Sequence, residues 1–140
     1  MAVPMGNEDA ERSGQIPPRD KGIAAEEGAS EFIRKKGYRI LRMNWRCRKG
    51  EIDIVAMDGD TLVFIEVKSR GSLSHGTPGE AVTVTKQRRI VAAATLCALH
   101  LGMEERAMRF DVVEVVGSGA CARYQLWRSA FTPGGRYLPL

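Results

Sequence analysis

The sequence predicts a small α/β domain in which helices flank a mixed β-sheet. Three observations lead to this fold class: two segments with helical spacing of apolar residues, a hairpin signal between two apolar strands, and a β-branched run after the second helix. The 140 residues fit one globular domain and leave no room for a second independent core. We expect a disordered leader over residues 1–20, the folded domain over 21–131 and a C-terminal tail over 132–140.

The first helix is expected from Ile23 to Lys36, with Gly37 at the position of a C-terminal cap. Its apolar residues recur at helical spacing and are Ala25, Ala29, Phe32 and Ile33. On a helical wheel, Glu26 lies about 60° from the centre of this apolar face, whereas Glu27 and Glu31 fall near the opposite side. Glu26 is therefore expected to border the core.

The remaining elements follow from alternation, turn residues and caps. Thr83 can cap a second helix that extends from Val84 to Leu101. The expected strands are Tyr38–Arg46, Glu51–Met57, Thr61–Ser69, Phe110–Val116 and Ala122–Arg128. The order is therefore helix, three strands, helix, two strands.

The hairpin around Asp58-Gly59 decides whether Asp53 and Glu66 lie together. A two-residue loop at Asp58-Gly59 pairs Asp53 with Phe64 and leaves Glu66 one diagonal away on the same face. A four-residue loop pairs Asp53 with Glu66 directly. Either even loop brings the two carboxylates together.

Two carboxylates on a half-buried face repel each other unless a cation lies between them. Mg²⁺ or Mn²⁺ is the expected cation, because the ligands are oxygen atoms and the sequence has no His or Cys cluster that selects zinc. Lys68, two residues after Glu66, could hold or deprotonate an attacking water. Glu26 would approach from the first helix. These groups suit metal-assisted hydrolysis of a phosphodiester. The alternative is an amphipathic hairpin with a cross-strand Glu–Lys pair and an exposed Asp53.

The folded part of the chain is basic, which suits either a nucleic-acid partner or a solvated basic face. Residues 1–31 carry seven acids and three bases, a net charge of −4, while residues 32–140 carry eighteen bases and ten acids, a net charge of +8. Eight bases and no acid lie between Phe32 and Gly50. Lys86, Arg88 and Arg89 in the second helix suit a phosphate partner or a solvated basic face equally well. The residues that we expect to contact nucleic acid are Arg46, Arg48, Lys49, Arg70, Lys86 and Arg89.

Other classes of protein are disfavoured by composition. No apolar run is long enough to span a membrane, and the polar, proline-containing start does not look like a signal peptide. The three cysteines form no C-x-x-C and suggest neither a disulfide framework nor a zinc site. We therefore expect a cytoplasmic protein with no membrane partner.

Several segments resemble a known nuclease group. Glu26, Gly50-Glu51-Ile52-Asp53 and Phe64-Ile65-Glu66-Val67-Lys68-Ser69-Arg70 resemble the acidic helix and the two active-site strands of the PD-(D/E)XK nuclease superfamily. Gly37-Tyr38-Arg39-Ile40-Leu41, Asn44-Trp45-Arg46 and Arg109-Phe110-Asp111-Val112-Val113 resemble the YraN-like family of small bacterial proteins, which is similar to archaeal Holliday-junction resolvases.

The resemblance implies a restriction-endonuclease-like αβββαβ core with a metal-dependent endonuclease site. Asp53 and Glu66 would be metal ligands, Lys68 the catalytic lysine and Glu26 the supporting acid. We also assign Val67 to the metal site. The implied substrate is nucleic acid, with DNA, including branched DNA, favoured by analogy, and a homodimer is expected.

Two other functions remain open at this point: a nucleic-acid-binding module with a nuclease fold that does not cut, and a protein-interaction domain. Three side-chain roles are open as well. Glu51 suits a water-mediated metal contact or an exposed strand position, and Asp111 suits a strand-end acid near the site or a salt bridge to Arg109. His75, in the predicted loop Gly71–Glu80, suits phosphate binding or plain surface exposure.

Overall fold

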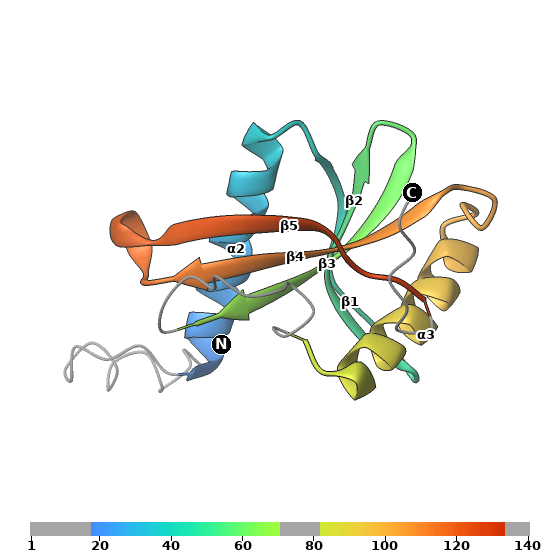
Figure 1. Ribbon diagram of the computed structural model, residues 1–140, viewed down its shortest axis with the longest axis horizontal. Helices are drawn as coiled ribbons and strands as arrows, with labels where there is room; N and C mark the ends of the chain where they lie inside the picture. Colours follow the sequence, from blue (N-terminus) through green and yellow to red (C-terminus); the bar gives the residue numbers. More distant parts are fainter. Residues whose placement is uncertain (1–17, 71–81, 134–140) are drawn as a thin grey trace, which may run out of the picture.

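The computed structural model describes residues 18–70 and 82–133, with side chains from residue 22 onward. Its elements are α2 (Pro18–Lys35), β1 (Arg39–Cys47), β2 (Gly50–Asp58), β3 (Thr61–Ser69), α3 (Val84–His100), β4 (Met108–Val116), the short helical turn η2 (Gly119–Cys121) and β5 (Arg123–Phe131) (Figure 1). The predicted order of helix, three strands, helix and two strands is confirmed. This arrangement is compatible with an αβββαβ nuclease-like core.

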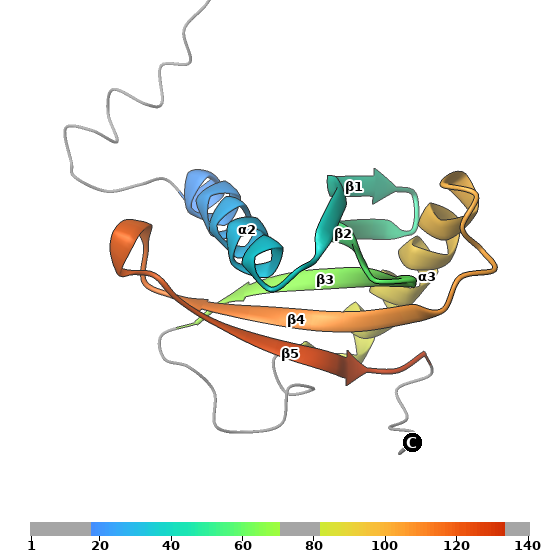
Figure 2. The ribbon, with the colours of Figure 1, turned by 90° about the horizontal axis from the view of Figure 1, so that it is seen from above.

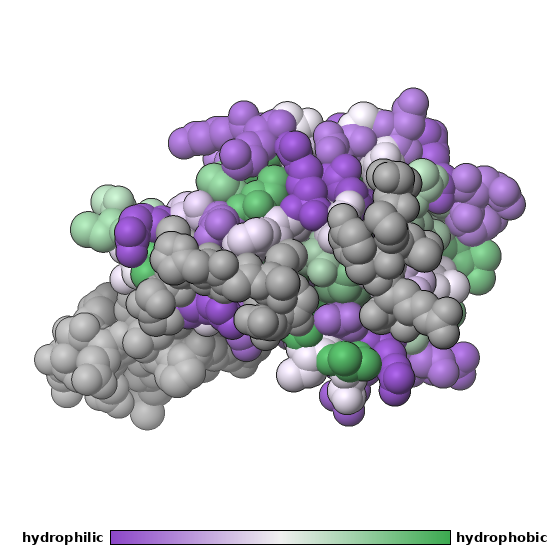
Figure 3. All heavy atoms as spheres, in the orientation of Figure 1, coloured by the Kyte–Doolittle hydropathy of each residue, from purple (hydrophilic) through white to green (hydrophobic). Residues whose placement is uncertain are grey.

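The five strands form one mixed sheet in the order β1-β2-β3-β4-β5. Only β3 and β4 pair in parallel, and α3 makes the crossover that parallel neighbours require. Because side chains alternate across the strands, the sheet supports two separate cores, one with α3 and the other with α2. On the face drawn in Figure 3, apolar side chains form scattered patches among hydrophilic ones.

The first helix packs through the apolar stripe that the sequence predicts, and the second begins at the predicted cap. Ala29 and Ile33 of α2 are fully buried, while Glu27 and Glu31 are exposed and Glu26 is half-buried at the border. Thr83 caps α3, since its hydroxyl accepts a hydrogen bond from the Lys86 N–H at 3.2 Å. Both sequence predictions are confirmed.

The β2–β3 hairpin has the register of the second predicted alternative, with a tighter turn. Asp58 pairs with Thr61, so Gly59 and Asp60 form a two-residue connection one position later than expected. Gly59 has a φ of 59°, which suits this turn. The ladder continues to Ile54 opposite Ile65. The next position along this register brings Asp53 opposite Glu66.

Beyond that point β2 leaves β3. The β2–β3 ladder ends at Ile54 and Ile65, whereas β1 and β2 stay paired as far as Cys47 and Gly50. A register shift after Ile40 bends β1, and the ends of β1 and β2 stand away from the plane of β3, β4 and β5 (Figure 2). This divergence opens the sheet at the position of the predicted carboxylates.

Two boundaries differ from the prediction by three residues or more, and the others agree with it to within two residues. The first helix begins at Pro18, earlier than the predicted Ile23, because proline is well tolerated in the first helical turn. The last strand ends at Phe131, where its aromatic ring packs on Phe110 with centroids 5.2 Å apart. The rest of the predicted leader, the predicted loop with His75, and residues 134–140 of the predicted tail lie outside the described residues. Within the part that is described, no helix is long and apolar enough to cross a membrane.

Candidate active site

Three carboxyl groups from three different elements meet where β2 leaves β3. Asp53 lies at the centre, with its residue only 9% exposed. Its Oδ2 accepts a hydrogen bond from the Val67 N–H at 2.8 Å, so the side chain takes a backbone donor of β3 just past the end of the ladder. Side-chain hydrogen bonds join Asp53 to Glu66 of β3 and to Glu26 of α2. The structure therefore brings three of the predicted site residues into one cluster.

Burial makes this cluster retain protons. It raises the pKa of Glu66 to about 8, with the charge of Asp53 as the second cause. Burial and the Asp53 charge likewise raise the pKa of Glu26 to about 7, against the hydrogen bond from Asn44. Burial also raises the pKa of Asp53, whereas the hydrogen bonds from the Val67 N–H and from Glu66 act to lower it. At neutral pH the cluster thus holds protons around a central Asp53.

The donor set of the cluster suits a hard divalent cation. Protonated neighbouring carboxyls indicate that a positive charge would be accommodated there. Among residues 18–70 and 82–133, no three or more His, Cys, Asp and Glu side chains are placed so that they alone could hold a metal ion. Mg²⁺ is typically bound by one or two carboxylates, with waters and substrate phosphate as its other ligands. Asp53 and Glu66 could supply the two carboxylates.

The two lysines near the cluster are placed differently. Lys86 of α3 lies beside Glu66, with its Nζ 3.7 Å from Oε1. Lys68 shares β3 with Glu66 and is exposed. Within the described part of the chain, no hydrogen bond or ion pair joins Lys68 to the carboxyl groups. The sequence predicted Lys86 as a nucleic-acid contact but gave no sign of its contact with Glu66.

The six predicted nucleic-acid contacts do not all line one cleft. Three of them, Arg46, Lys86 and Arg89, line a cleft of about 300 Å³ between the β1–β2 turn and α3. Arg70 lines a different cavity of about 330 Å³ beside α2. Arg48 and Lys49 are exposed in the β1–β2 turn and line neither.

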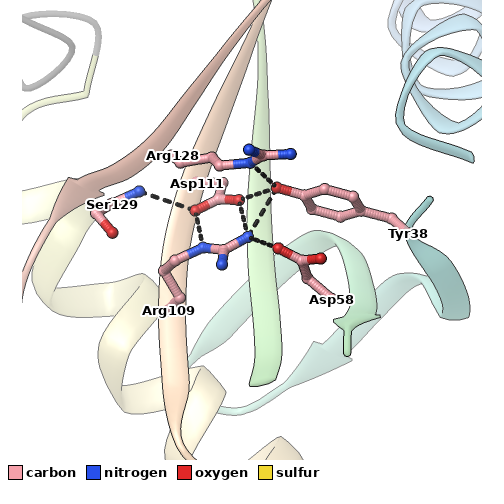
Figure 4. Close-up of polar contacts among 6 residues, drawn as sticks. All are labelled: Tyr38, Asp58, Arg109, Asp111, Arg128 and Ser129. Carbon is pink, nitrogen blue, oxygen red and sulfur yellow. Dashed lines mark hydrogen bonds and ion pairs between the residues drawn. The ribbon is translucent and has the colours of Figure 1, made fainter. Parts of the chain in front are cut away.

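Asp111 belongs to a separate buried polar cluster, drawn in Figure 4. Its Oδ1 accepts hydrogen bonds from Arg109 Nε at 2.9 Å and from the Ser129 N–H at 3.0 Å. Its Oδ2 accepts one from the Tyr38 hydroxyl at 2.8 Å. Arg109 also reaches Asp58 at 2.9 Å. Of the two roles that the sequence left open for Asp111, the salt bridge to Arg109 is therefore the observed one.

The other open side chains are placed as follows. Glu51 is exposed and pairs with Arg46 at 3.4 Å, and its charge helps to raise the pKa of each of the three clustered carboxyls. Trp45 and Trp127 pack against the α3 core cluster.

Comparison with known proteins places the chain. Residues 25–115 match the model of the uncharacterised protein family UPF0102, a span that includes Glu26, Asp53, Glu66 and Lys68. The chain belongs to the UPF0102 family. This confirms the resemblance to the YraN-like group.

Individual UPF0102 proteins are closely similar over most of their length. One from Symbiobacterium thermophilum is 50% identical over 114 residues, which cover 81% of this chain and 97% of that protein. One from Caldicellulosiruptor saccharolyticus is 48% identical over 97 residues, 69% of this chain and 82% of its own. One from Desulforapulum autotrophicum is 43% identical over 110 residues, 79% of this chain and 91% of its own. The UPF0102 relatives thus share the folded part of the chain.

Proposed function

We propose that this UPF0102 protein is a metal-dependent endonuclease of the PD-(D/E)XK type that hydrolyses phosphodiester bonds in nucleic acid, with DNA as the favoured substrate. The observation that carries the proposal is the meeting of Glu26, Asp53 and Glu66 where β2 and β3 separate. Burying three acids together is unfavourable, and burial raises the pKa of each of them. A site that binds a divalent cation gives such an arrangement a purpose.

In this proposal each group has a distinct task. Asp53 and Glu66 hold Mg²⁺ or Mn²⁺. Val67, the residue after Glu66 in β3, belongs to the same metal site. A cation held there would lower the pKa of a bound water and would neutralise charge that develops on the phosphate. Lys68, which is exposed and free to approach a substrate, holds or deprotonates the attacking water. Glu26 supports the cluster from α2 as an outer acid.

The basic residues supply the substrate affinity. Positively charged side chains bind phosphates of any sequence and make the affinity depend strongly on salt. The cleft lined by Arg46, Lys86 and Arg89 opens beside the carboxyl cluster, since Lys86 contributes to both. A bound strand would thus meet cations and carboxylates side by side.

The experiment that tests the proposal is cleavage of labelled duplex, single strand, flap, four-way junction and RNA in Mg²⁺ or Mn²⁺. We expect cutting by the wild-type protein and none by Asp53→Ala. Glu27→Ala is the matched control, because Glu27 is an exposed acid beside Glu26 and should leave the rate unchanged. Binding without cutting across the panel would instead identify a non-catalytic module. The absence of both binding and cutting would contradict a nucleic-acid function.

A further inference from the structure

The cleft between the β1–β2 turn and α3 has the composition of an anion site. It is lined by Arg46, Cys47, Gly50, Glu51, Lys86, Arg89 and Ile90, and it has a volume of about 300 Å³. Three cations and one acid therefore face the same space. Since a water takes about 30 Å³, the cleft has room for a phosphate group together with several waters.

Two local contacts border this cleft. The Arg46 guanidinium lies 3.4 Å from the Glu51 carboxylate across the β1–β2 hairpin, and this pair is exposed to solvent. Gly50 approaches the α3 backbone so closely that a side chain on it would contact the Arg89 carbonyl at 3.4 Å. Gly50 at the start of β2 and Arg89 of the helix are thus close neighbours, and Arg89 and Lys86 line the cleft from the helix side.

Lys86 connects this cleft to the carboxyl cluster. Its side chain lines the cleft and also places Nζ 3.7 Å from Glu66 Oε1, while 39% of the side chain remains exposed. A phosphate in the cleft would therefore lie next to the carboxylates without displacing them. Lys86 can pair with either neighbour, because a lysine ammonium is a compact charge on a flexible stem.

We propose that the Arg46–Lys86–Arg89 cleft is a phosphate subsite that binds a backbone phosphate of the nucleic-acid strand next to the one held at Asp53 and Glu66. That the strand is nucleic acid rests on the proposed function. That the ligand is a phosphate of its backbone rests on the charge and the size of the cleft. Arg89 and Arg46 make charge-assisted contacts to the phosphate, and Lys86 exchanges its contact with Glu66 for one with the phosphate when the strand binds.

The test compares two adjacent arginines of α3. Arg88 and Arg89 carry the same charge and are both exposed, but only Arg89 lines the cleft. We would measure binding of a fluorescent single-stranded oligonucleotide to the full-length protein in the absence of divalent metal, for wild type, Arg89→Ala, Arg46→Ala and Arg88→Ala. The salt dependence of each affinity would be measured as well, and thermal unfolding would verify that each variant is folded.

If the subsite is specific, Arg89→Ala and Arg46→Ala each weaken binding by about tenfold. Each also makes the slope of log affinity against log salt concentration shallower by about one. Arg88→Ala changes both quantities much less. Equal losses for Arg88→Ala and Arg89→Ala would show a diffuse basic surface and overturn the subsite. Unchanged binding in Arg89→Ala would overturn it too. Inorganic phosphate that binds the cleft as tightly as the oligonucleotide would contradict the assignment to a backbone phosphate.

These measurements need no metal and no cleavage. If the protein proves not to be a nuclease, a loss specific to Arg89→Ala and Arg46→Ala still supports the subsite. If it cleaves nucleic acid while Arg88→Ala and Arg89→Ala behave alike, the subsite fails and the nuclease stands.

Discussion

The Lys86 ammonium lies 3.7 Å from Oε1 of Glu66, so α3 supplies a cation to a carboxyl group of β3. The charge of Lys86 lowers the pKa of both Glu66 and Asp53, although burial of these groups prevails. The cluster therefore has some positive charge beside it, but too little to keep all three acids ionised at neutral pH. The first predictions follow from this balance.

Stability without metal should fall as the pH rises from about 4.5 to about 8. Glu66 has its pKa raised from 4.5 to about 8 on folding, so in this range the folded protein holds a proton that the unfolded chain has lost. Its stabilising effect is complete below the unfolded pKa and disappears as the pH passes the folded one. We expect the Tm to fall by several degrees over this range, since 1 kcal/mol shifts the Tm of a domain of this size by about 2–8 °C.

Glu66→Gln is the variant that tests this assignment. An amide cannot ionise, so the decline of Tm with pH should become shallower and the variant should be the more stable protein at pH 8. A decline of the same size in Glu66→Gln would show that other groups cause it.

The two lysines should separate in their effects. Lys86→Gln removes the cation beside Glu66, so the pKa of Glu66 should move above about 8 and the decline in Tm should extend to higher pH. Lys68→Gln should leave that profile in place, yet lower kcat by about 10²–10⁴ if Lys68 acts on the attacking water. Measuring Tm against pH and single-turnover cleavage in both variants distinguishes the roles. Full activity in Lys68→Gln would remove Lys68 from the mechanism.

The polar cluster around Asp111 should contribute stability and not chemistry. Asp111 is fully buried and accepts hydrogen bonds from Arg109, Tyr38 and Ser129. Asp111→Ala removes one of the hydrogen-bond partners of the partly buried Arg109 guanidinium. We expect the free energy of unfolding, measured with urea, to fall by about 3–5 kcal/mol. Asp60→Ala is the control, because Asp60 is fully exposed in its pair with Arg106. This substitution should not change the urea concentration at which half of the protein is unfolded. A small loss in Asp111→Ala would contradict the structural role.

Gly28 should resist substitution although it lies in a helix. A Cβ at Gly28 would lie 2.0 Å from the Tyr124 hydroxyl oxygen, and the Tyr124 ring is stacked on Phe32 with centroids 5.2 Å apart. Gly28→Ala should therefore cost about 1–3 kcal/mol through overpacking. Gly22→Ala meets no atom within 4 Å and should stabilise α2 by up to about 1 kcal/mol. Chemical unfolding of both variants measures the difference, and equal effects would exclude the Tyr124 contact.

The sequence predicted much of the fold because its signals are local. The spacing of Ala29 and Ile33 and the cap at Thr83 each depend on neighbours along the chain, and each is confirmed. The parity of the hairpin also carried over, because both even loops place Asp53 and Glu66 on one face. The exact turn was not predicted. Asp58 and Thr61 form the last pair of the ladder, so the two connecting residues are Gly59 and Asp60 instead of Asp58 and Gly59.

The candidate site was less accessible to sequence reasoning. The acids could be listed, but the contact between Lys86 and Glu66 depends on how α3 packs across β2 and β3. The Asp111 cluster joins residues of β2, β4 and β5 with Tyr38, which directly precedes β1, and Tyr38 and Asp111 are 73 positions apart. Such contacts follow from the register of the whole sheet, which no local pattern specifies.

The protons held among Glu26, Asp53 and Glu66 should give way to a divalent cation when the metal binds. Calorimetric titration with Mn²⁺ at pH 7, in two buffers of different ionisation enthalpy, measures both metal binding and proton release. We predict one site that releases protons on binding and is lost in Asp53→Asn, whereas Glu27→Gln binds as the wild type does. Absence of binding, or binding that persists unchanged in Asp53→Asn, would contradict the account.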